Sequence, residues 1–246
     1  MIYIQSNIGG RTENQDFYGS AQTKFGELLV VCDGMGGHNG GRYAAERAMQ
    51  IIIDEVIKSV DLNPAKALQE TILKANEAIW QESNTNANLK GMGTTVVALL
   101  ITPERAICCH VGDSRIYQLR KGKIIHRTSD HSHVFDLVQQ GKMTEEQARL
   151  SDISNVITRS LGTKFALNVE ITDNLSYKTG DRFFLCTDGI WSMIPESQLI
   201  EMIYEEGDVE SVVVNLVEKI NTIGIANGGN HDNLTAALLE VETSSK

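Results

Sequence analysis

The sequence is poor in several features that would place it in a special class of protein. Its 246 residues include only three prolines and no low-complexity run, so we expect no long disordered linker. No stretch approaches the roughly 18 consecutive apolar residues of a membrane span. The N-terminal segment lacks the charged and apolar regions of a secretory signal. These absences predict a globular protein of the cytoplasm with no membrane partner.

Cysteine is also scarce, and none of it has metal-binding spacing. No two cysteines form a CxxC pair, so a cysteine-rich zinc site is not expected. All of them lie in apolar, strand-like runs, which predicts buried free thiols in a reducing compartment. The four cysteines are Cys32, Cys108, Cys109 and Cys186.

Positive charge is in the minority. The chain has 22 Lys and Arg against 32 Asp and Glu, a formal net charge of -10. Such a balance disfavours non-specific binding to nucleic acid, so we expect no nucleic-acid partner. It does not exclude a phosphorylated substrate, because a local site can be positive within an acidic protein.

The hydrophobic pattern predicts a mixture of antiparallel strands and helices. Residues 1–33 read as short strands, and the apolar residues of 45–56 recur at helical spacing. Asn63 is placed to cap a second helix, with Pro64 at its first position. Further strands follow from residue 93, short helices and loops are expected at 131–161, and two strands, helices and a last strand complete the chain. This order is not a regular alternation of strand and helix, so we expect an α+β fold.

Four carboxylates lie where predicted strands begin or end. In antiparallel pairing, the end of one strand and the start of its neighbour lie at one edge of the sheet, so these carboxylates could converge. Clustered carboxylates need cations, and oxygen ligands favour Mg²⁺ or Mn²⁺ over zinc. Each residue alone could equally be a turn or surface aspartate. The four are Asp33, Asp113, Asp188 and Asp232.

The N-terminal motif "GGRTENQD" adds two candidates. Arg11 could hold phosphoryl oxygens through its planar fork of donors, and Asp16 could join the carboxylate cluster. From this segment alone, a surface arginine and a hairpin carboxylate are the favoured explanation of the motif.

Eight motifs in order resemble the metal-dependent Ser/Thr protein phosphatases of the protein phosphatase 2C family, in its bacterial form. The resemblance implies one catalytic domain over residues 1–246: a four-layer α-β-β-α sandwich of two antiparallel sheets, with a flap at about 131–160. The motifs are "GGRTENQD", "VVCDGMGGHNGG", "GMGTTVVALL", "CHVGDSRIYQLR", "TSDHSHVFDLVQQGKMTEEQA", "NVITRSLG", "FFLCTDGIW" and "NHDNLTAALLEV".

The resemblance implies a role for each matching residue. Asp33, Asp188, Asp232 and the Gly34 carbonyl would bind two central Mn²⁺ or Mg²⁺ ions, with Asp33 bridging them. Asp16 would lie in or beside that shell. Asp113 matches the residue associated with a third, weaker metal. Arg11 would hold the substrate phosphate.

The resemblance also implies the reaction and the partners. Water activated between the two ions would hydrolyse phosphoserine and phosphothreonine in proteins. A cognate Ser/Thr kinase, or the substrates of that kinase, would be the biological partners, and we expect a monomer.

The sequence departs from the family pattern at two positions. Some relatives have a histidine directly after the metal-binding Asp-Gly, where this chain has Met35. The general acid is therefore unassigned, and His38 nearby is more simply read as the start of a helix. Gln15 replaces a commoner glutamate, so any role of that charge is lost.

Three other functions compete with this interpretation. Cys109 and Arg115 have the C-x5-R spacing of thiolate phosphatases. A regulatory module could bind phosphoproteins without hydrolysing them. A metal-dependent nuclease would keep the metals but needs a basic groove, which the sequence does not show. His131 and His133 of the flap motif are read as structural residues rather than ligands.

Overall fold

The computed structural model describes residues 1–36 and 40–242 of the chain. Within them the chain divides into two compact units. We call one the terminal unit, because it includes both ends of the chain: Met1–Asn14, Arg115–Ser129 and Tyr177–Lys246. We call the other the central unit: Gln15–Ser114 and Asp130–Ser176. Each unit is built on one antiparallel sheet.

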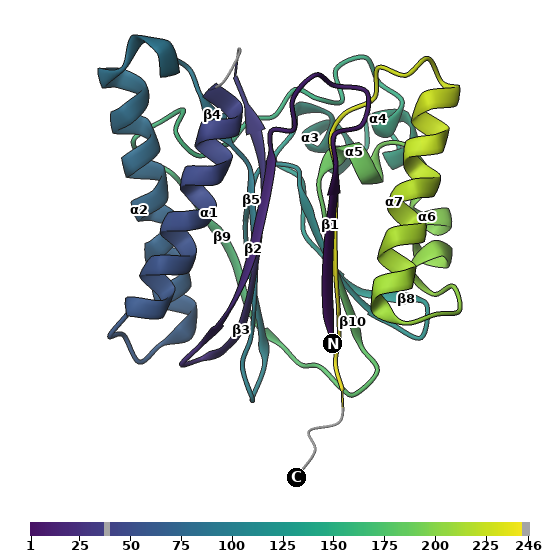
Figure 1. Cartoon of the computed structure of the whole chain (residues 1–246), viewed down its shortest axis with the longest axis horizontal. Coiled ribbons are helices and arrows are strands. Elements are labelled where there is room, and N and C mark those ends of the chain that lie inside the picture. The colour runs from purple at the N-terminus through teal and green to yellow at the C-terminus, as the bar shows by residue number, and fades with distance from the viewer. Residues whose placement is uncertain (37–39, 243–246) are drawn as a thin grey trace. The chain divides into compact units, whose positions relative to one another are not determined.

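The terminal unit is a five-stranded sheet with helices on one face (Figure 1). Its strand order is β1-β11-β10-β7-β8, and α7 packs on β1 and β11. Its apolar core lies between the sheet and the helices, where Phe184, Leu216 and Leu238 are fully or almost fully buried. The strands are β1 (Ile2–Asn7), β7 (Arg115–Arg120), β8 (Lys123–Arg127), β10 (Arg182–Cys186) and β11 (Leu234–Glu240). The helices are α5 (Asp188–Trp191), α6 (Glu196–Ile203) and α7 (Val209–Ala226).

The central unit is a larger sheet covered by a pair of long helices (Figure 1). The strand order is β2-β3-β5-β6-β9, the short β4 pairs with β3, and α1 packs on β2, β3 and α2. The strands are β2 (Asp16–Thr23), β3 (Gly26–Met35), β4 (Gly93–Thr94), β5 (Val96–Ile101), β6 (Ala106–Val111) and β9 (Glu170–Leu175). The helices are α1 (Gly40–Lys58), α2 (Pro64–Thr85), the 3-10 turn η1 (Ala87–Leu89), α3 (His133–Gln139) and α4 (Glu145–Arg149).

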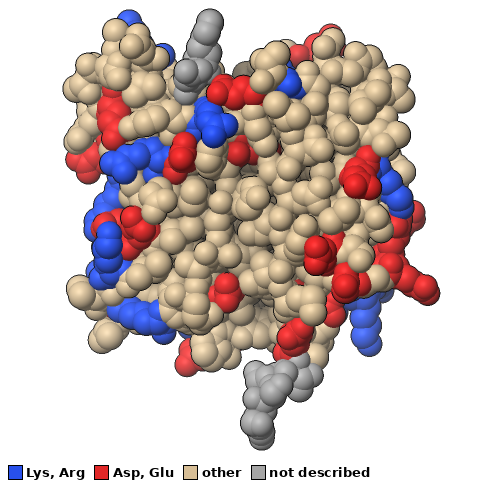
Figure 2. Space-filling model, in the orientation of Figure 1, with Lys and Arg blue, Asp and Glu red and all other residues tan. Residues whose placement is uncertain are grey.

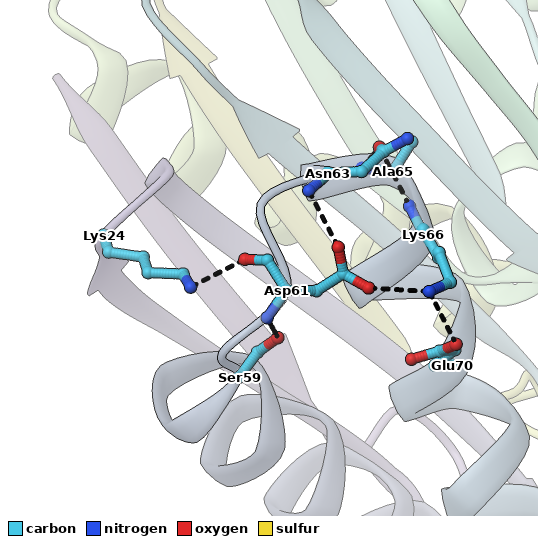
Figure 3. A network of polar contacts seen from close by, with 7 residues as sticks. All are labelled: Lys24, Ser59, Asp61, Asn63, Ala65, Lys66 and Glu70. Atoms are coloured by element: carbon cyan, nitrogen blue, oxygen red, sulfur yellow. Dashed lines mark hydrogen bonds and ion pairs between the residues drawn. The ribbon is translucent and has the colours of Figure 1, made fainter.

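The connection between α1 and α2 is held by hydrogen bonds to Asp61 (Figure 3). The Lys24 Nζ donates to the Asp61 carbonyl at 2.7 Å, and the Lys66 Nζ donates to the Asp61 carboxylate at 2.9 Å. Asn63 caps α2 as predicted, because its Oδ1 accepts from the backbone N–H groups of Ala65 and Lys66. The turn between the end of α1 and the start of α2 is therefore held by side-chain hydrogen bonds.

Charges of both signs lie together on the helices of the central unit (Figure 2). Lys74 pairs with Glu55 at 2.8 Å, and Arg47 pairs with Glu82 at 3.2 Å. Exposed pairs of this kind stabilise a fold only weakly. The charges on this face therefore offset one another and form no basic surface.

The structure confirms the expected fold class of two antiparallel sheets flanked by helices. The apolar stripe of residues 45–56 is buried core, and all four cysteines are buried and free. The predicted strand near residues 165–176 is shorter than expected, since only β9 pairs, with β6. The four-residue α5 was not foreseen, because one turn carries no helical periodicity. Among the described residues, no helix is long and apolar enough to cross a membrane.

A buried ion pair in the terminal unit gives the first prediction. The Asp181 carboxylate accepts from Arg120 at 2.6 and 2.7 Å and from Gln118 at 3.1 Å. Burial alone would raise the pKa of Asp181, but these hydrogen bonds outweigh it and hold the pKa below its usual range. A lowered carboxyl pKa stabilises the fold above the unfolded value of about 3.9, and that stability is lost as pH falls through the folded pKa.

We expect Asp181→Asn to lower the free energy of unfolding by about 1.5–3 kcal/mol at pH 7, because the hydrogen bonds that Arg120 donates lose their charged acceptor. The deficit should shrink below pH 3.9 (approximate unfolded pKa). Urea unfolding at pH 7 and pH 3 measures both effects, with the exposed Asp152→Asn as control. A deficit that is equal at the two pH values would contradict this account.

Candidate metal centre

Asp16 and Asp33 occupy directly opposed positions on two paired strands of the central unit. Asp16 opens β2, Asp33 lies near the end of β3, and the two are Cα partners in the antiparallel register. Opposed residues place their Cβ atoms about 4.5–5.5 Å apart, where like charges destabilise the sheet. Asp16 is nevertheless only 5% exposed. A cation bound between these two carboxylates would offset their repulsion.

The neighbouring Cys32 reports the same negative potential. Its thiol is completely buried, and burial raises its pKa, with further increases from the charges of Asp33 and Asp16. The negative charges of Asp33 and Asp16 therefore act together on this neighbouring thiol.

Backbone hydrogen bonds fix the position of Asp33. Its N–H donates to the Thr95 Oγ1 at 3.0 Å, and its carbonyl accepts from the Thr95 N–H at 2.8 Å and the Thr94 hydroxyl at 2.9 Å. Thr95 lies between β4 and β5, at the break in the predicted strand. Both the N–H and the carbonyl of Asp33 are therefore fixed by hydrogen bonds.

The same Thr95 hydroxyl reaches the segment of Asp113. Its Oγ1 lies 2.8 Å from the Ser114 Oγ, directly after Asp113. Asp113 follows β6 and is 3% exposed. Because β3 and β6 both pair antiparallel with β5, their ends lie at the same edge of the sheet. Asp16, Asp33 and Asp113 therefore lie at one edge of this sheet.

Gly34 has a structural reason to lack a side chain. A Cβ at this position would overlap the carbonyl of Gly41 in the first turn of α1 and crowd the carbonyl of Gln15. The missing side chain lets the end of β3 and the start of α1 approach backbone to backbone.

The terminal unit gathers its predicted residues at one edge of its own sheet. Asp188 follows β10 and Asp232 precedes β11, and these strands are antiparallel with Cys186 opposite Ala236. β1 ends beside the start of β11, so Arg11 comes to the same edge. The Arg11 Nη2 donates to the Asp232 Oδ2 at 2.8 Å.

Asn233 ties the Arg11 loop to the Asp232 segment. It is 5% exposed, and its side-chain amide donates to the carbonyls of Ile8 at 2.8 Å and Glu13 at 3.0 Å. The Gly10 N–H also donates to the His231 carbonyl at 3.0 Å. Both sides of the Arg11 loop are therefore fastened to the residues around Asp232.

Gly189 and Thr187 place Asp188 against the same segment. A Cβ at Gly189 would overlap the Asn233 carbonyl, so this position also needs glycine for close backbone approach. The Thr187 hydroxyl accepts from the Thr235 N–H at 3.1 Å, and the Thr187 N–H donates to the Thr235 carbonyl at 3.1 Å. The glycines after Asp33 and Asp188 therefore serve the same packing purpose in the two units.

Sequence reasoning missed the residues that hold these carboxylates in place. Thr95, Ser114, Asn233 and His231 make long-range contacts that no local pattern reveals. The available signals were the paired threonines of "GMGTT" and the polar run "NHDN".

A second cluster in the central unit could be taken for a metal site. One ligand atom each from His110, His131 and Glu170 lies within 4.8 Å of the others. However, the His131 Nδ1 accepts from the Gly112 N–H at 3.1 Å, which puts the ring proton on Nε2. That Nε2 lies 3.1 Å from the Glu170 carboxylate, to which it donates. A protonated nitrogen cannot ligate a metal, so we interpret the cluster as structural.

The electrostatics of His131 agree with this interpretation. Burial lowers its pKa, more strongly than the hydrogen bond to Glu170 raises it. The ring also stacks on His110, with centroids 4.6 Å apart. His131 is thus held neutral in one tautomer. The expectation that His131 is structural fits these contacts.

Three other residues considered in the sequence analysis are Cys109, Met35 and His38. Cys109 lies within β6, opposite Ala98 of β5, and burial raises the pKa of its thiol. A thiolate nucleophile in a phosphate-binding loop is therefore wrong for this residue. Met35 is the last residue of β3. His38 lies outside the described residues.

Comparison with known proteins identifies relatives over nearly the whole chain. Residues 5–239 match the family model for protein phosphatase 2C. The serine/threonine phosphatase stp of Listeria monocytogenes is 31% identical over 241 residues, 96% of this chain and 93% of that protein. Protein phosphatase PhpP of Streptococcus pneumoniae is 32% identical over 247 residues, 98% of this chain and 97% of that protein.

Solved structures agree with these relatives. The serine/threonine phosphatase Stp1 from Staphylococcus aureus has a TM-score of 0.87 at 27% identity, covering 98% of this chain and 95% of that one. The catalytic domain of the serine threonine protein phosphatase PstP, solved with two manganese ions, has a TM-score of 0.83 at 27% identity, with 99% and 98% covered.

The shared hydrogen bonds of Thr95 give a prediction. Thr95→Val keeps the side-chain shape but leaves the Asp33 N–H and the Ser114 hydroxyl without this partner. We expect about 10-fold weaker Mn²⁺ binding, as for other residues that orient metal ligands. We also expect a loss of about 1–3 kcal/mol in the free energy of unfolding.

Isothermal titration calorimetry with MnCl₂ and urea unfolding measure the two effects. Thr95→Ser keeps the hydroxyl and is the matched control, which should bind Mn²⁺ like the unaltered protein. Wild-type Mn²⁺ affinity in Thr95→Val would remove Thr95 from the site.

Proposed function

The chain belongs to the protein phosphatase 2C family and is a metal-dependent serine/threonine protein phosphatase, and we propose that the carboxylates at its two sheet edges hold the metal ions. The observation that carries this proposal is the directly opposed pair of like charge formed by the buried Asp16 and the half-buried Asp33. The donors of the assigned ligands are all oxygen atoms, which fits Mn²⁺ or Mg²⁺. Gly34, the residue after Asp33, lets the end of β3 and the start of α1 meet backbone to backbone at this site.

We assign the ligands as the family motifs imply. Asp33, Asp188, Asp232 and the Gly34 carbonyl would hold two ions, with Asp16 in or beside their shell. Asp113 would serve a third, weaker site. When bound, such ions lower the pKa of water and offset negative charge on a phosphoryl group. On this assignment both units contribute to one catalytic domain.

Arg11 is assigned to the substrate phosphate. Its guanidinium carries five N–H donors, and one nitrogen donates to Asp232. The other donors can form two parallel hydrogen bonds to phosphoryl oxygens. Asp232 would thus hold Arg11 in orientation while Arg11 neutralises charge on the group being transferred.

The substrates are phosphoproteins, as the names of the relatives indicate. We propose that the physiological partner is a Ser/Thr kinase or its substrates, and that the enzyme acts as a monomer in the cytoplasm. Reducing conditions there suit four buried free thiols. Relatives named as phosphatases give no support to a binding module without activity.

Hydrolysis assays with p-nitrophenyl phosphate and a phosphothreonine peptide test the function. We expect activity in MnCl₂ or MgCl₂, none in EDTA, and no effect of a thiol alkylator, because the metals and not a thiolate supply the chemistry. Activity that survives EDTA and disappears on alkylation would overturn the proposal. Inactivity under every condition would favour the binding module.

Asp188→Asn tests the ligand assignment. Losing one charged ligand should lower kcat at least ~100-fold, which corresponds to about 2.7 kcal/mol of transition-state stabilisation. The melting temperature of the metal-free protein should not fall, since the substitution keeps the side-chain shape. Near-normal turnover at saturating Mn²⁺ would remove Asp188 from the metal site.

Arg11→Ala tests the phosphate assignment. We expect KM for p-nitrophenyl phosphate to rise about 10-fold, because a charge-assisted hydrogen bond contributes roughly 1.5–3 kcal/mol. Arg11→Lys is the matched variant, which keeps the charge but not the planar fork, and it should recover only part of the affinity. If Arg11→Ala has the kinetic constants of the unaltered enzyme, Arg11 does not touch the phosphate.

A further inference from the structure

His231 lies between the proposed site and the last turns of α7. The chain leaves α7 at Ala226 and turns back through Gly228 and Gly229, both with positive φ angles. This turn brings His231 back against the helix that it has just left. Asp232 is the next residue, so the placement of His231 bears directly on it.

Two contacts on α7 fix the ring of His231. Its Nε2 lies 2.9 Å from the Asn221 Oδ1, and because that oxygen can only accept, Nε2 is the donor. The ring also lies directly on the helix backbone at Gly224, where an added Cβ would overlap the ring atoms. Gly224 is itself buried. The hydrogen bond to Asn221 therefore fixes the orientation of the ring, and the missing side chain of Gly224 lets the ring lie against the helix backbone.

The backbone of His231 is hydrogen-bonded to the loop that contains Arg11. Its carbonyl accepts from the Gly10 N–H, next to Arg11, at 3.0 Å. On the other side, Asp232 binds Arg11 and Asn233 binds the ends of the Arg11 loop. A shift of His231 would therefore move Asp232 and Arg11 together.

We propose that His231, seated on Gly224 and hydrogen-bonded to Asn221, is a positioning residue that sets the place of both Asp232 and Arg11. This inference rests on the proposed function, in which Asp232 binds metal and Arg11 binds phosphate. It assigns to the end of α7 the orienting role that residues behind metal ligands generally have.

Gly224→Ala is the sharpest test, because it removes no polar group and alanine favours helix. The added methyl displaces the His231 ring. We expect Mn²⁺ binding about 10-fold weaker by calorimetry, as when other orienting residues are changed. We also expect lower kcat and higher KM together. Ile225→Ala, at an exposed position of the same turn, is the control and should leave all of these unchanged.

Two further variants separate position from packing. His231→Ala removes the ring without adding bulk, and it tests the inference even if Gly224→Ala fails to fold. His231→Gln restores an N–H donor toward Asn221 and should recover part of the Mn²⁺ affinity. In the metal-free protein, the Gly10 amide should exchange with solvent faster in His231→Ala than in the unaltered chain.

The outcomes distinguish this inference from the function beneath it. Wild-type Mn²⁺ affinity, kinetics and Gly10 exchange in both Gly224→Ala and His231→Ala would overturn the positioning role alone. An unaltered enzyme that neither binds nor needs Mn²⁺ would overturn the proposed function. The Gly10 exchange rate would then still decide whether His231 holds the Arg11 loop.

Discussion

Repulsion between carboxylates is the constraint on which the site depends. Asp16 and Asp33 oppose one another across paired strands, and Asp16 is buried while Asp33 is half-buried. A sheet does not tolerate this arrangement without compensation, so the surrounding residues must hold the strands in place and leave room for cations. The network of Thr94, Thr95 and Ser114 holds the strands in place, and the missing side chain of Gly34 lets β3 and α1 pack backbone to backbone beside Asp33.

The terminal unit meets the same demand with different residues. Asn233 and the Arg11–Asp232 ion pair tie one loop to another, and Thr187 joins the end of β10 to β11. In the central unit, Thr95 exchanges hydrogen bonds with the main chain of Asp33 on β3. In the terminal unit, Thr187, which precedes Asp188, exchanges hydrogen bonds with Thr235 on β11. The carboxylates therefore sit on main chain that is fixed by the sheet itself rather than on free loops, which suits ligands that must keep their geometry.

Local patterns predicted much of the fold and the proposed ligands, but not what supports them. The Asn63–Pro64 start of α2, the buried stripe of α1 and the gathering of aspartates at strand ends all follow from short-range rules. The helix α5 was not predicted, because a single turn shows no helical periodicity. The roles of Thr95 and His231 were not predicted, because their partners lie far along the chain or across a turn set by two glycines. Such contacts exist only once the fold has formed, so no window of sequence contains them.

The burial of the cysteines has a consequence for the conditions under which the enzyme can work. All four cysteines lie inside strands and are buried. Peroxide oxidises exposed thiolates, whereas burial raises the pKa of the Cys32, Cys108 and Cys109 thiols. Peroxide inactivates phosphatases that attack through cysteine, because their nucleophile is an accessible thiolate. The proposed metal-dependent chemistry uses no thiol, so oxidation of a cysteine would not remove its nucleophile.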